Sequence, residues 1–219
     1  MAEPVKQPRR YDSPRRREQA AATRRDILVA AQRLFERDGY AATTMAAVAA
    51  EAGVAPKTVY VAFETKSGLL RALWNMLLRG DQDDVPVAQR RWYLDVLEEP
   101  DPVRKLRLNA RNARVVKQRI GALLGVIRSA ATAESDIAAL WDRIQRDFHE
   151  NQQRVVEGLH AGKGLRRDLD VARATDVLWT LNHPDVWLLL VRERGWTPEQ
   201  WEQWFADTAC QQLLEPARS

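Results

Sequence analysis

Five residues that could contact a nucleic acid fall within six positions of one another: Pro56, Lys57, Thr58, Tyr60 and Val61. The Lys57 ammonium suits guanine O6 and N7, and the Tyr60 hydroxyl can donate to a phosphate. Pro56 and the Thr58 methyl group suit thymine methyls. The small and apolar positions of the segment, among them Val59, are expected to face inward, which leaves Lys57, Thr58, Tyr60 and Val61 facing outward. The pattern predicts a surface that binds duplex DNA.

Residues 45–64 supply the elements that would position this surface, namely a helix, a tight turn and a second helix. Ala49 lets the helices cross closely, and Gly53 suits a left-handed turn. Thr43 or Thr44 is expected to cap the first helix, and Thr44 can also hold a phosphate there. The second helix is expected to begin at Pro56, after a residue without a capping side chain.

Apolar residues recur at helical spacing along the chain, and no strand-like alternation appears, so the predicted fold class is all-α. A three-helix DNA-binding domain is expected over 21–66, and a larger helical domain over 67–219. A basic arm over 1–20 is expected to be disordered. Its arginines could reach into a minor groove or act only as filler. The expected helices are 23–38, 45–52, 56–63, 66–79, 87–97, 103–131, 135–159, 171–182, 185–192 and 198–214.

Charge is distributed unevenly over the 219 residues. Residues 1–66 hold 12 Lys and Arg against 8 Asp and Glu, whereas the remainder is balanced at 22 of each. A basic N-terminal part beside a neutral remainder is typical of a nucleic-acid module joined to a module with another task.

Several function classes find no support in the sequence. The single cysteine, Cys210, fits a reducing cytoplasm, and no apolar run is long enough to span a membrane. The three histidines have no metal-ligand spacing, and no Gly-rich phosphate loop or G-x-S-x-G elbow occurs. We therefore expect a cytoplasmic protein with no metal, no cofactor and no catalytic residues.

Residues 23–70 resemble the DNA-binding domain of the TetR family of bacterial transcriptional regulators, over LFERDGYAATTMAAVAAEAGVAPKTVYVAFETKSGLL. The AG-V turn, the tyrosine of the recognition helix and the Phe-x-x-Lys after it carry the resemblance. It implies that Lys66 contacts the DNA backbone, with a solvated lysine as the alternative. The segment DVLWTLNHPDVWLLLVRERGWTPEQWEQWFADT looks like the family's dimerisation helices.

Two apolar stripes near the C-terminus could form a dimer interface as a four-helix bundle. Packing within one chain is the alternative, and we favour the dimer because the middle of the chain already supplies core helices. A homodimer would match a palindromic operator. The stripes are Ala174, Val177, Leu178 and Leu181 on one helix and Trp201, Trp204, Phe205 and Thr208 on the next.

Eight tryptophans suggest an apolar cavity in the larger domain, although each of them also suits an ordinary core. The candidate lining residues are Trp92, Trp141 and Phe148, with Asn112 and His183 as polar partners. For His183, a capping role in the loop before Pro184 is the favoured alternative.

The sequence leads to a dimeric repressor that a small apolar or aromatic effector releases from DNA. One alternative is a DNA-binding regulator without an effector, controlled by dimerisation or a partner protein. A helical enzyme with an incidental helix-turn-helix is the third. Only the family resemblance favours repression over activation.

Overall fold

A computed structural model describes residues 14–80 and 87–215, and the part that it describes is built from helices. A single isolated bridge between Leu165 and Leu214 is the extended pairing found there. The all-α prediction is confirmed. Residues 81–86, between the expected helices 66–79 and 87–97, lie outside the described residues.

The N-terminal helices are α1 (Pro14–Ala42), α2 (Met45–Glu51) and α3 (Pro56–Phe63). Gly39 has φ 80° and interrupts α1 where the sequence predicted its end. The start of α1 differs from expectation: residues 14–20, predicted to be disordered, are helical. The run RRREQAAA consists of strong helix formers, which favour extension of the helix toward the N-terminus. The rest of the predicted arm, 1–13, lies outside the described residues.

The remaining helices end close to their predicted positions. They are α4 (Lys66–Arg79), α5 (Arg91–Glu98), α6 (Pro102–Ala131), α7 (Ser135–Ala161), α8 (Val171–Leu181), α9 (Pro184–Trp187) and α10 (Pro198–Leu213). A 3₁₀ turn at Val87–Gln89 precedes α5, and a π-helical stretch at Leu188–Glu193 follows α9.

Side-chain caps explain many of these boundaries. Thr65 and Asp170 cap α4 and α8, and Thr197 with Gln200 forms a capping box at the start of α10. The start of α7 agrees with the expected helix 135–159, and Glu134, which makes no side-chain capping hydrogen bond, holds the N-cap position.

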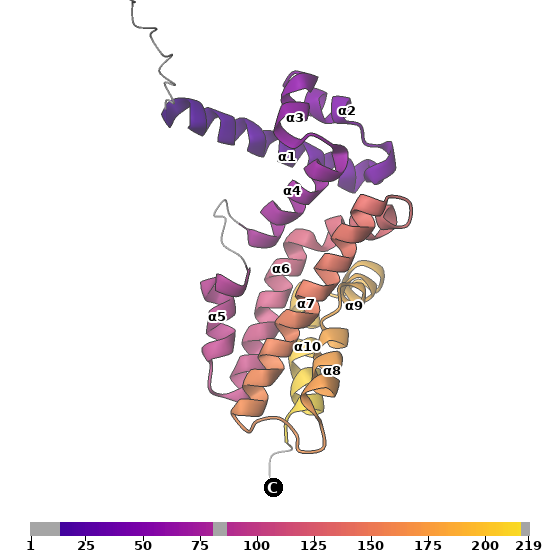
Figure 1. Ribbon diagram of the computed structural model, residues 1–219. Helices are drawn as coiled ribbons and strands as arrows, with labels where there is room; N and C mark the ends of the chain where they lie inside the picture. The colour runs from indigo at the N-terminus through magenta and orange to yellow at the C-terminus, as the bar shows by residue number, and fades with distance from the viewer. Residues whose placement is uncertain (1–13, 81–86, 216–219) are drawn as a thin grey trace, which may run out of the picture.

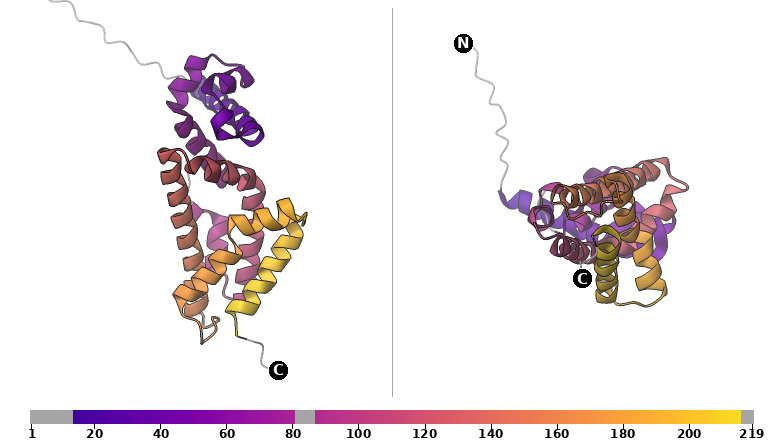
Figure 2. Two further views of the ribbon diagram at one scale, coloured as in Figure 1. Left: turned by 90° about the vertical axis from the view of Figure 1, so that its right-hand side faces the viewer. Right: turned by 90° about the horizontal axis from the view of Figure 1, so that it is seen from below.

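The molecule is elongated, with α1–α3 at one end and the C-terminus at the other (Figures 1 and 2). The long helices α6 and α7 run through the body, and α8 and α10 pack beside them. No described helix has both the length and the apolar character that a membrane span requires.

Two apolar cores hold these helices together. The first core joins α1–α4 to the C-terminal half of α6 and the N-terminal half of α7. The second core joins α5, the N-terminal half of α6 and the C-terminal half of α7 to α8–α10. Because the first core extends from α1–α4 into α6 and α7, the N-terminal helices are packed firmly onto the body.

Candidate nucleic-acid interface and ligand cavity

The outer face of α3 carries the five residues predicted to contact DNA. Tyr60 is 52% exposed and Val61 76%, and Pro56, Lys57 and Thr58 are exposed as well. Val59 between them is fully buried against Val48 and Ala49 of α2. Burial of one face by the apolar positions therefore leaves a polar, donor-bearing face available to a partner.

The helix ends of this unit follow the predicted chemistry. Thr44 caps α2, with its Oγ1 accepting from the Ala47 amide at 3.0 Å. Gly53 has φ 66°, the left-handed conformation that the turn requires. Ala55 is the N-cap of α3 and offers no side-chain acceptor, so the start of α3 relies on Pro56 to fix the backbone.

Two cations fasten α3 and α4 to α1. The Arg24 guanidinium donates to the Ala62 carbonyl at 2.6 Å and lies 4.2 Å from the centre of the Phe63 ring. Lys66 Nζ donates to the carbonyls of Tyr40 at 2.9 Å and Ala41 at 3.4 Å. Lys66 thus has a structural role in addition to the DNA contact that the family resemblance implies.

The junction between α3 and α4 is tight. Glu64 has φ 62° and ψ −56°, and the Thr65 amide donates to the Phe63 carbonyl at 2.6 Å, which closes a strained γ-turn. A Cβ on Gly68 would lie only 2.4 Å from the Phe63 carbonyl oxygen. The last turn of the recognition helix therefore rests directly on the first turn of α4.

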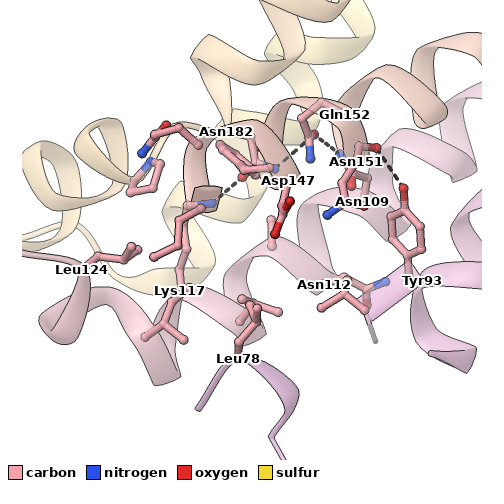
Figure 3. A pocket seen from close by; sticks show the side chains of 18 of the residues that line it. Leu78, Tyr93, Asn109, Asn112, Lys117, Leu124, Asp147, Asn151, Gln152 and Asn182 are labelled. Atoms are coloured by element: carbon pink, nitrogen blue, oxygen red, sulfur yellow. Dashed lines mark hydrogen bonds between the residues drawn. The ribbon is translucent and has the colours of Figure 1, made fainter. Parts of the chain in front are cut away.

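A cavity of about 130 Å³ lies in the body, between the two cores. Trp74 and Leu78 of α4 form one wall, and residues of α5, α6 and α7 form the others (Figure 3). Its surface is mainly apolar, with contributions from Val116, Ile120 and Leu124. A pocket with mostly apolar walls and a few placed polar groups is typical of a small-molecule site.

Four buried polar side chains form a hydrogen-bonded chain on the cavity wall. Lys117 Nζ donates to Asn182 Oδ1, and Gln152 Oε1 accepts from Asn182 Nδ2 at 3.2 Å and from Asn109 Nδ2 at 3.3 Å (Figure 3). Lys117 is 5% exposed, and burial lowers its pKa to about 7. Its Nζ also lies 4.9 Å from the centre of the Trp201 ring and 5.5 Å from that of Phe148.

The structure brings three of the five predicted pocket residues to this cavity. Trp92 and Phe148 line it, and Asn112 lines it while donating to the Trp92 carbonyl at 2.7 Å. Two predictions are wrong. Trp141 packs against the first core instead, because it lies about two turns nearer the start of α7 than Phe148.

His183, the second wrongly predicted lining residue, caps α9, with its Nδ1 accepting from the Asp185 amide at 3.2 Å. Its Nε2 lies 3.3 Å from Oε1 of Gln145, a residue that lines the cavity. Burial is the main cause of its lowered pKa; Asp185 opposes the shift, and the nearby cations Lys117 and Arg128 add to it. The capping role that the residue before Pro184 suggested is therefore the one observed.

Half of the predicted dimer stripes faces the interior of the same chain. Ala174, Leu178, Trp201 and Phe205 are fully buried in the second core, so they cannot contact a partner directly. The reason is that α8 and α10 pack on each other and on α6 and α7, which covers their most apolar faces. The flanking residues Val177, Leu181, Trp204 and Thr208 stay partly exposed.

Sequence reasoning missed the polar chain and the α4 wall. A signal was present at Lys117, which falls in the same helical register as the apolar positions Ala110, Ala113, Ile120 and Leu124. A lysine among apolar positions of a core helix indicates a buried cation. Asn182, Gln152 and Asn109 offered no comparable pattern, because their partners lie on other helices.

The sequence of this chain is similar to those of known regulators. Residues 27–73 match the model of the bacterial regulatory proteins of the tetR family. A probable HTH-type transcriptional regulator, ArpR of Pseudomonas putida, is 28% identical over 181 residues, which cover 80% of this chain and 85% of ArpR.

Solved structures share the fold over most of the chain. NalD, described as the secondary repressor of the MexAB-OprM multidrug efflux pump in Pseudomonas aeruginosa, aligns with a TM-score of 0.67 and 21% identity, covering 90% of this chain and 98% of NalD. A putative transcriptional regulator from Saccharomonospora viridis, in complex with choline, aligns with a TM-score of 0.71 and 18% identity, covering 90% of this chain and all of its own.

The helix-turn-helix, with its exposed recognition face on a helical body, defines a DNA-binding protein of the helix-turn-helix class. The match over 27–73 makes this helix-turn-helix similar to those of the bacterial regulatory proteins of the tetR family, and the chain as a whole is similar to a transcriptional regulator in sequence and to NalD in fold.

Proposed function

We propose that this regulator is a homodimeric repressor, which leaves a palindromic operator when a small apolar or aromatic effector enters the cavity. The observation that carries the proposal is the α4 wall: Trp74 and Leu78 line the cavity from the helix whose first turn supports α3. A ligand that pushes on this wall would therefore act on the recognition helix through one rigid element.

The effector would work by population shift. It can move the equilibrium between DNA-binding and released conformations only by as much as its affinities for them differ. A cavity partly walled by α4 meets this condition, because movement of α4 changes its shape. The Ser67 hydroxyl, near the start of α4, also donates to the Asp136 carboxylate of α7 at 3.3 Å, which ties the same helix to the body.

In this proposal Lys57, Thr58, Pro56 and Val61 read bases, and Thr44, Tyr60 and Lys66 hold phosphates. Their exposure on one end of the molecule supports these roles, apart from the half-buried Lys66. Effector binding and repression find support in two relatives of the same fold, one described as a repressor and one bound to choline.

The proposal is tested by filling the cavity. Duplexes that bind the protein are first selected from a random library, and their release by small aromatic compounds is measured by fluorescence anisotropy. Ala113 lines the cavity from α6, so Ala113→Phe should keep DNA binding but abolish release. The matched control is Ala161→Phe, at an exposed position of α7 away from the cavity.

Two outcomes would contradict the proposal. Selected duplexes without an inverted repeat would argue against a two-fold symmetric reader. Release that is as strong in Ala113→Phe as in the wild type would place the effector elsewhere, and absence of release by any compound would favour a regulator without an effector.

A further inference from the structure

We infer that the cavity selects a small aromatic acid, whose anionic group pairs with the Lys117 ammonium while its ring fills the apolar part. This inference rests on the proposed effector role of the cavity and adds the chemical class of the effector. The inference is argued from the size of the cavity, from the lack of an anionic partner for Lys117 and from the charged groups around the cavity.

Size limits the effector to about one ring. The cavity holds about 130 Å³. A dry engineered cavity of about 150 Å³ in another protein binds benzene, so a benzene-sized ring fits here with little rearrangement. The apolar walls from α4 and α6 provide surface against which such a ring can be buried.

The buried amine lacks an anionic partner. The acceptor of Lys117 Nζ is Oδ1, the side-chain amide oxygen of Asn182. Among the residues that the structure describes, no carboxylate forms an ion pair with Lys117. A buried charge without a partner is costly, and an anion placed beside it recovers much of that cost. An acidic ligand would supply this missing anion, whereas a cationic one would add repulsion.

Other titratable groups around the cavity do not replace such an anion. Asp147 of α7 lines the cavity but is exposed, and it makes no ion pair with Lys117 within the described part of the chain. His183, before α9, has a lowered pKa, and Tyr93 of α5 has a raised one, chiefly through burial in both cases. Both are therefore neutral between pH 7 and 8.5. Trp74 and Leu78 of the α4 wall do not titrate, and neither does Trp201 of α10, whose ring lies beside the Lys117 amine.

Calorimetry on the full-length protein tests the inference, with benzoate, the neutral benzamide and the cationic benzylamine as probes. Benzoate is expected to bind about tenfold or more tightly than either of the others at pH 7, because it alone pairs with the ammonium. Equal or tighter binding of benzamide or benzylamine would overturn the inference.

Proton uptake on binding distinguishes an ion pair with Lys117 from apolar packing of the ligand alone. The pKa of Lys117 is about 7 in the free protein, and a bound anion raises it. Benzoate binding at pH 8.5 should therefore take up about one proton, and its affinity should fall roughly tenfold between pH 7 and pH 8.5. Benzamide affinity should stay constant over this range. Benzoate binding without proton uptake would contradict the assignment.

Two variants locate the effect at Lys117. Lys117→Met removes the amine, and Lys117→Gln removes the charge but keeps a donor for Asn182. Both should lose the preference for benzoate and the proton uptake, and a cooperative thermal transition establishes that each is folded. Lys163→Met, at an exposed lysine after α7, is the control and should behave as the wild type. Retention of the preference in both Lys117 variants would overturn the inference.

The test separates this inference from the proposed function. If benzamide binds as well as benzoate and releases DNA, the effector role stands and selectivity for acids is wrong. If none of the three probes binds the wild-type protein, the acid site is wrong, whereas the effector role is decided by the DNA-release assay with the other aromatic compounds.

Discussion

Gly68 is the position at which the end of the recognition helix α3 comes closest to the first turn of α4. Its missing side chain lets the Phe63 carbonyl approach to a distance that no Cβ allows, and the strained Glu64 turn depends on that approach. A residue outside the predicted DNA-contacting set thus permits the close contact between the end of α3 and the first turn of α4.

Gly68→Ala should therefore destabilise the protein by about 1–3 kcal/mol, because the new methyl group must displace backbone rather than a flexible side chain. Thermal unfolding measures the effect. Gly125→Ala is the control: a Cβ there meets nothing within 4 Å inside α6, so it should stabilise the protein by about 0.5–1 kcal/mol. Equal stability of both variants and the wild type would contradict this view of the junction.

At the scale of elements, the exposed face of α3 carries both kinds of proposed DNA contact, one to bases and one to phosphates. Lys57 lies in its first turn, beside the bases in the proposed orientation, whereas Tyr60 lies a turn later. Base contacts set sequence preference, and phosphate contacts set position and overall affinity.

Lys57→Ala should relax preference at one position in each half-site by about 1–3 kcal/mol. Tyr60→Phe should instead weaken binding to all duplexes alike by about 1 kcal/mol, because it removes one phosphate donor. Anisotropy titrations on the selected duplex and its single-base variants distinguish the two. If either change leaves binding to every duplex untouched, that residue is not a contact.

Local signals predicted most of the elements. The caps at Thr44, Thr65, Asp170 and Thr197 depend on neighbours within three residues, so the sequence alone places them. The helical start of α1 was not predicted, because the basic, apolar-poor composition of 1–20 favours disorder, whereas the strong helix formers within 14–20 favour helix. Periodicity identified the apolar faces of α8 and α10, but it does not say which chain covers them.

The candidate site depended on contacts that no local pattern contains. The exposed face of α3 was predictable, since Val59 and its neighbours define the opposite face. The cavity was predicted only in part, because its α4 wall and the partners of Lys117 come from segments far apart in sequence.

At the scale of the whole molecule, the elongated body places α8 and α10 side by side on α6 and α7, with a partly exposed outer surface. In the proposed dimer this surface meets its copy, and two recognition helices would then reach successive major grooves.

Thr208→Arg should yield monomers in analytical ultracentrifugation, because it places a charge on the proposed interface at a partly exposed site of α10. Binding to a full palindrome should weaken strongly, while binding to one half-site changes little. Ala139→Arg, at an exposed position of α7, should remain dimeric. A dimeric Thr208→Arg would place the interface elsewhere.

The first core has a consequence for building hybrids from regulators of this family. Ile120, Leu123, Leu124 and Ile127 of α6 are buried with residues of α1 and α4. The segment that ends at Lys66, if it were cut from the chain, would lose the residues of α4, α6 and α7 that complete its hydrophobic core. Exchange of this segment between relatives should therefore preserve DNA sequence specificity only when the matching stretch of α6 and the start of α7 are exchanged as well.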